Sequence, residues 1–73
     1  MPQKRSITID GHRTSFSLED EFWVEVLRLA KAEGVSIAHL VRRIDRKRGA
    51  DRNLSSALRL HVLDVLKREA AGN

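Results

Sequence analysis

The chain has 73 residues and no cysteine, and its 14 lysines and arginines outnumber its ten aspartates and glutamates, giving a formal net charge of +4. A chain of this size forms one domain at most, and such a domain buries only about 60% of its unfolded surface, so we expect a second copy to stabilise it. The lack of cysteine excludes disulfides and thiolate zinc sites, and no apolar run approaches the roughly 20 residues of a membrane-spanning helix. The positive charge suits a polyanionic partner.

Residues 5–17 predict a β-hairpin. Two segments of alternating polar and apolar residues flank the dipeptide Asp10-Gly11, which is a favoured pair for the two-residue type I′ turn. This turn places Ile9 opposite His12. The alternation then assigns Ile7, Ile9, Phe16 and Leu18 to one face of the hairpin, and Ser6, Thr8, Arg13 and Ser15 to the other.

A first helix is predicted over residues 18–33. Ser17 is the expected N-cap, acidic residues occupy the first turn, and Gly34 is well placed to end the helix in the left-handed conformation. The apolar stripe of this segment is wider than that of a lightly buried surface helix, which indicates two packing neighbours.

Two further helices complete the prediction. Residues 36–48 carry apolar side chains at helical spacing behind a Ser36 cap, and residues 54–69 do so behind an Asn53 cap. The sequence therefore indicates one mostly α domain, spanning residues 1–73, with a short N-terminal β segment.

The order strand, helix, Gly-x-Ser turn, helix, from Arg13 to about Arg48, resembles the Arc and methionine repressor superfamily. The segments SITIDGHRTSFSLEDEFW, beginning at Ser6, and NLSSALRL, beginning at Asn53, resemble a group of short bacterial ribbon-helix-helix-domain proteins. The resemblance implies a ribbon-helix-helix fold in which two chains intertwine as a homodimer, with a third C-terminal helix added. It also implies a transcriptional regulator, such as a repressor, that reads double-stranded DNA through a β-ribbon in the major groove.

The resemblance also implies site residues. The outward residues of the strand, Arg13, Ser15 and Ser17, are expected to contact bases, and Arg13 is the strongest candidate because a guanidinium can bind guanine in a bidentate manner. The start of the second helix is expected to bind phosphate through its free amides. The expected phosphate-binding residues are Lys4, Arg5, Val35, Ser36, Ile37, Arg42 and Arg43. The expected dimer core consists of Phe16, Leu18, Phe22, Trp23, Val26, Leu40, Val41 and Ile44.

Each of these roles has a simpler alternative. An exposed strand arginine can serve only to protect a sheet edge, and a basic run on a helix is usually a solvated face. The segment 6–9 is either an added strand or a mobile arm with Lys4 and Arg5 on phosphates. The third helix either packs over the dimer core or joins dimers into tetramers.

Other functions are less favoured by the sequence. The three histidines lack the i, i+3 or i, i+4 spacing of helical metal ligands, and no paired acidic residues or glycine-rich phosphate loop stand out. We therefore expect no metal, no cofactor, no small-molecule substrate, no membrane partner and no enzymatic activity. No apolar signal stretch follows Met1, so we expect a cytoplasmic protein. The alternative function is a dimeric adaptor or antitoxin-like module that uses the same fold.

Overall fold

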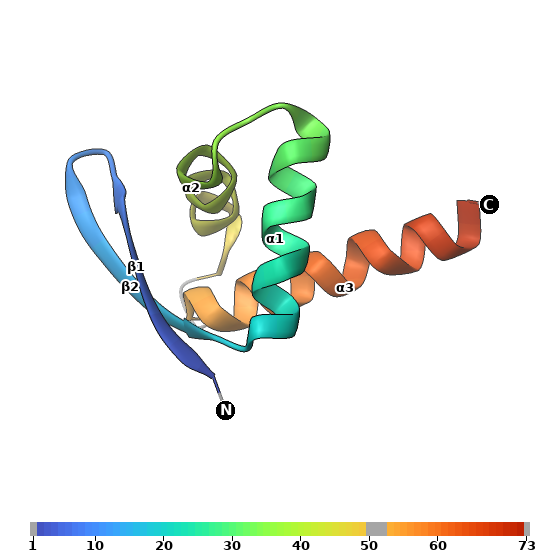
Figure 1. Ribbon diagram of the computed structural model, residues 1–73, viewed down its shortest axis with the longest axis horizontal. Coiled ribbons are helices and arrows are strands. Elements are labelled where there is room, and N and C mark those ends of the chain that lie inside the picture. Colours follow the sequence, from blue (N-terminus) through green and yellow to red (C-terminus); the bar gives the residue numbers. More distant parts are fainter. Residues whose placement is uncertain (1, 50–52, 73) are drawn as a thin grey trace.

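The structure is a computed structural model that describes residues 2–49 and 53–72. A β-hairpin of β1 (Gln3–Ile9) and β2 (His12–Leu18) is followed by the helices α1 (Asp20–Glu33), α2 (Ile37–Lys47) and α3 (Leu54–Gly72). Figure 1 shows α2 between the hairpin and α1, while α3 passes α1 and extends beyond it. The fold is thus mostly α, with a short N-terminal β segment and a third helix. In the described part of the chain, no helix has the length and apolar character needed to cross a membrane.

The hairpin has the predicted turn and register. Asp10 and Gly11 both adopt positive φ, 52° and 79°, as a type I′ turn requires, and Ile9 pairs with His12. The pairing continues to the end of both strands, where Gln3 lies opposite Leu18. The strands are therefore longer than the predicted hairpin, which spanned residues 5–17.

The predicted start of α1 is wrong. Ser17 was expected to cap a helix beginning at residue 18, but Ser17 and Leu18 belong to β2 and α1 begins at Asp20. Glu19 occupies the cap position without a side-chain hydrogen bond to the helix. The strand persists because the N-terminal residues Gln3 and Lys4 pair with its last two residues. The other end of α1 agrees with the prediction, since Gly34 has φ of 72°.

The caps of the other two helices follow the sequence closely. The Ser36 hydroxyl accepts a hydrogen bond from the His39 amide at 3.0 Å, and the Asn53 side-chain oxygen accepts one from the Ser56 amide at 2.8 Å. The second helix lies within its predicted bounds of 36–48, whereas α3 continues to Gly72, three residues beyond the predicted end.

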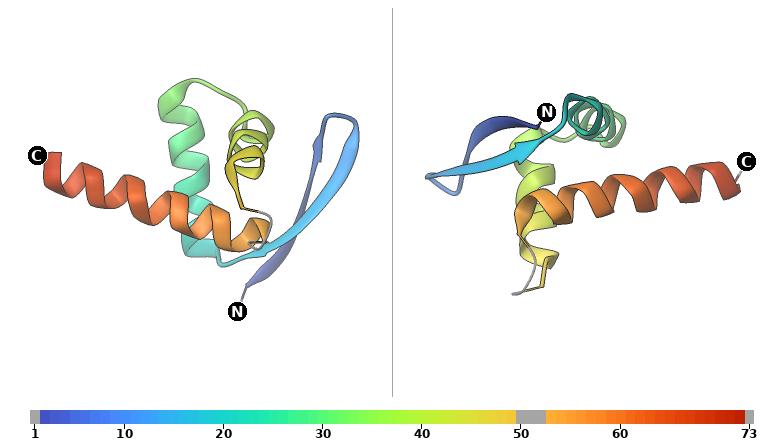
Figure 2. Two further views of the ribbon diagram at one scale, coloured as in Figure 1. Left: turned by 180° about the vertical axis from the view of Figure 1, so that it is seen from behind. Right: turned by 90° about the horizontal axis from the view of Figure 1, so that it is seen from below.

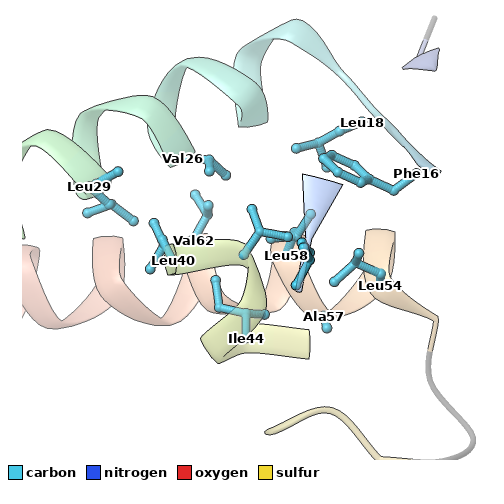
Figure 3. Packing of buried hydrophobic residues seen from close by; sticks show 13 residues of the cluster. Phe16, Leu18, Val26, Leu29, Leu40, Ile44, Leu54, Ala57, Leu58 and Val62 are labelled. Carbon is cyan, nitrogen blue, oxygen red and sulfur yellow. The ribbon is translucent and has the colours of Figure 1, made fainter. Parts of the chain in front are cut away.

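The hydrophobic core lies between the inner face of the hairpin and the three helices. Within it, Leu18, Leu40, Leu58, Val26, Val41 and Val62 are almost completely shielded from solvent. Figure 3 shows Leu58 and Val62 of α3 pointing toward side chains of α1, α2 and β2. The third helix therefore packs over the core of its own chain.

Candidate nucleic-acid interface

The outer face of the hairpin is polar and basic. Three cross-strand pairs lie there, and in each a residue of β1 faces one of β2: Lys4 and Ser17, Ser6 and Ser15, Thr8 and Arg13. All six residues are exposed, and the Ser6 and Ser15 hydroxyls lie 3.3 Å apart. Two cations and four hydroxyls, with no carboxylate among these pairs, form a surface suited to a polyanion. We call this set of six residues the outer sheet face.

Two of the three predicted base-reading residues lie near its middle. Arg13 and Ser15 are exposed on neighbouring outward positions of β2, and Arg13 has no acidic partner within residues 2–49 and 53–72. Ser17 is exposed at the end of the strand. The structure therefore leaves the guanidinium of Arg13 available to a ligand.

Arg5 lies on the opposite, inner face of the hairpin. It pairs with Phe16 across the sheet, and its guanidinium carbon lies 4.8 Å from the centre of the Trp23 ring. Its Nη2 also lies 2.6 Å from an Asp20 carboxylate oxygen, and its side chain is only 18% exposed. These contacts do not support the predicted phosphate-binding role of Arg5. Because β1 is paired along its whole length, the structure has an added strand in place of a mobile N-terminal arm.

The start of α2 faces the tip of the hairpin across a small cavity of about 250 Å³. Val35 and Ile37 are half-buried against the core, so only their backbone could reach an anion. The Ser36 hydroxyl already accepts the His39 amide. The Asp10 carboxylate and the Arg42 guanidinium line the same cavity and pair with each other, so the cation is already compensated there.

The arginines of α2 are paired with carboxylates from distant segments. Arg42 lies 3.0 Å from Asp10, and Arg46 lies 3.6 Å from the same carboxylate. Arg43 lies 2.8 Å from Glu33; its hydrogen bond lowers the pKa of Glu33, and the same bond raises the pKa of Arg43. Because these charges are compensated within the chain, the basic run predicted to bind phosphate is less available than the outer sheet face.

The free edge of β2 carries a feature that sequence reasoning missed. The Ser17 amide donates a hydrogen bond to the hydroxyl of Ser55, in the first turn of α3, across 3.1 Å. Backbone amides along a strand point to alternate edges, so the amides of Ser15 and Arg13 point to the same edge as that of Ser17. Nothing in the sequence signals that a serine of the third helix closes the end of this edge.

Most of the predicted dimer core is buried inside one chain. Six of the eight residues are buried, while Phe22 and Trp23 are partly buried against the same core. The ring centre of Trp23 lies 6.0 Å from that of Phe16. The eight residues thus form or border the core of a single chain, and a contribution to a dimer core stays a prediction.

Comparison with protein families gave one finding. A family model described as a ribbon-helix-helix domain matches residues 2–66, which include the hairpin, α1, α2 and most of α3. Searches among curated proteins and among solved structures gave no match.

Proposed function

The chain belongs to the ribbon-helix-helix domain family, and from that membership we propose a sequence-specific DNA-binding regulator that acts as a homodimer in the cytoplasm. Ribbon-type readers place strands in a groove of the duplex. The observation that carries the proposal is the contrast between two basic surfaces. On the outer sheet face Arg13 has no acidic partner in the described part of the chain, whereas the arginines at positions 42, 43 and 46 of α2 are ion-paired.

The free edge of β2 supports a particular form of the homodimer. Because the Ser17 amide already donates its hydrogen bond to Ser55, the backbone groups of Arg13 and Ser15 are the ones on this edge that can pair with a second strand. Antiparallel pairing with the same edge of another copy sets Arg13 of each chain opposite Ser15 of its partner. The two-fold axis then passes beside Thr14, and β1 lies on the outside of a four-stranded sheet.

Strand spacing determines how such a sheet meets DNA. Four strands at about 4.8 Å spacing place the outermost strands roughly 14 Å apart, whereas the major groove is roughly 12 Å wide. We therefore assign the central β2 strands, with Arg13 and Ser15, to base contacts. The outer β1 strands lie at the groove walls, where Lys4 contacts phosphate.

The test is selection of bound sequences from a random duplex pool, followed by affinity measurements on the enriched sequence. Arg13→Ala and Arg13→Lys are expected to reduce the preference for that sequence over random DNA by about 5- to 150-fold for each of the two half-sites, because a bidentate base contact contributes about 1–3 kcal/mol. Lys31→Ala is the control, since Lys31 is an exposed cation in the last turn of α1. Enrichment of no sequence by the wild-type chain would instead favour an adaptor or antitoxin-like function.

A further inference from the structure

The middle of α3 carries an exposed apolar stripe. Leu60, Leu63 and Leu66 are 42%, 47% and 40% exposed, although each is a large aliphatic side chain. At 100° per residue, Leu60 and Leu63 lie about 200° and 140° around the helix from the buried Leu58. Leu63 therefore points away from the core, while Leu60 borders a shallow cavity beside Ile44 and Lys47 of α2. Figure 2 shows the C-terminal end of α3 extending beyond the other elements.

Charges beside the stripe favour another copy of α3, running antiparallel, as its partner. Asp64 and Lys67 follow Leu63 by about 100° and 40°, so both lie on one flank of the stripe. In a parallel pair of helices, the flank that carries both charges would face the opposite flank of the partner, so Asp64 and Lys67 would not meet. An antiparallel pair sets each Asp64 beside the other chain's Lys67, which satisfies both.

The charges are available for this role. Asp64 forms an ion pair with Arg68 one turn further along the helix, and the second carboxylate oxygen can accept another cation. Lys67 has no carboxylate partner within the described residues of its own chain. A reversed copy of α3 supplies that carboxylate.

We propose that the stripe of Leu60, Leu63 and Leu66 is a self-association surface on which α3 packs antiparallel against α3 of a second copy. Leu63 of each chain packs near Leu66 of the other chain. Asp64 of each chain likewise pairs with Lys67 of the other chain. This surface lies on the part of α3 that follows Ser55, and Figure 1 shows α3 running away from the hairpin. Together with pairing of the β2 edges, it joins two dimers into a tetramer.

Light scattering after size exclusion tests the proposal over a range of concentrations. Leu63→Glu and Leu60→Glu are each expected to halve the mass of the assembly while leaving the far-ultraviolet circular dichroism unchanged. Val24→Glu is the matched control, because Val24 is 58% exposed but belongs to α1. A wild-type chain that stays monomeric, or an assembly whose mass neither leucine substitution changes, overturns the proposal.

A charge exchange tests the antiparallel arrangement. Asp64→Lys alone is expected to weaken the assembly by about 2- to 30-fold, the usual contribution of two exposed ion pairs, and Asp64→Lys combined with Lys67→Asp is expected to restore it. Failure of the double variant to regain association overturns the antiparallel pair. These outcomes do not depend on DNA binding or on the β2 edge: the mass falls from four copies to two if both surfaces operate, and from two to one if only α3 does.

Discussion

The amide of Ser17 and the hydroxyl of Ser55 lie 3.1 Å apart in a hydrogen bond that connects the end of β2 to the first turn of α3. It links residues 38 positions apart in the sequence and fixes where the free strand edge ends. Two consequences follow. The bond holds the third helix against the sheet, and it limits the length of edge that another strand can use.

Ser55→Ala should lower the free energy of unfolding by about 1 kcal/mol, the usual net contribution of one hydrogen bond, because it leaves the Ser17 amide without this partner. The midpoint of thermal unfolding should fall by about 4–8 °C. The matched control is Ser56→Ala, since the Ser56 hydroxyl has no hydrogen-bond partner in the described residues and only its amide is used, by Asn53. An equal loss in both variants would contradict the assigned role of Ser55.

Lys4 and Arg5 should differ in function although they are adjacent. Arg5→Gln should lower thermal stability and shift the fluorescence of Trp23, because Arg5 contacts both that ring and the Asp20 carboxylate. Lys4→Gln should leave stability unchanged and weaken DNA binding, with a log–log salt slope reduced by about 0.9 per lost phosphate contact. Thermal melts and binding titrations of both variants distinguish them. If Arg5→Gln weakens DNA binding without destabilising the fold, the inner-face assignment is wrong.

Asp10→Asn should increase DNA affinity. Asparagine tolerates the positive φ of 52° at this turn, so the hairpin is retained while Arg42 and Arg46 lose their carboxylate partner. The released cations should steepen the dependence of binding on salt concentration. Glu25→Gln changes the net charge by the same amount, next to Arg28 on α1, and serves as control. An equal gain in both variants would show a nonspecific charge effect.

His61 should make the stability of the fold depend on pH. Burial, followed by the nearby Arg43, lowers the pKa of His61 below its usual value of 6.5, although Glu33 and Asp64 oppose the shift. The unfolded chain therefore takes up this proton more readily than the folded chain. Stability should be complete above about pH 6.5 and should decrease as the pH falls toward the folded-state pKa.

Chemical denaturation between pH 7.5 and 5.0 measures this effect. Glu33 does not obscure the contribution of His61, because the folded-state pKa of Glu33 is also lowered and its carboxylate stays ionised over this range. The His61→Leu variant should show a flatter dependence. His39→Gln, which changes an exposed histidine of α2, should behave like the wild type. A wild-type stability that is constant over this range would contradict the prediction.

The sequence predicts the features whose causes are local. Alternation and the Asp10-Gly11 turn determine the hairpin register, and Ser36, Gly34 and Asn53 mark helix ends through contacts within a few residues. Ser17 could not be placed in the same way. Its local pattern is that of a helix cap, but strand pairing with Lys4 and the hydroxyl of Ser55 come from distant parts of the chain.

The charged residues of the candidate site show the same division. Alternation along β2 predicts the outward direction of Arg13, and extended back along β1 it would also have placed Arg5 beside Ile7 on the inner face. The partners of Arg42 and Arg43 could not be read from sequence. Asp10 and Glu33 reach them only after the hairpin and α1 have packed against α2.

The position of Leu58 and Val62 in the core also affects the timing of folding during synthesis. The hairpin pairs residues close in sequence, so it can form while translation continues. The part of the core surface of the hairpin, α1 and α2 that faces α3 stays uncovered until the ribosome has released α3, which supplies both side chains. A nascent chain that stalls before Leu58 therefore exposes this surface to chaperones and proteases.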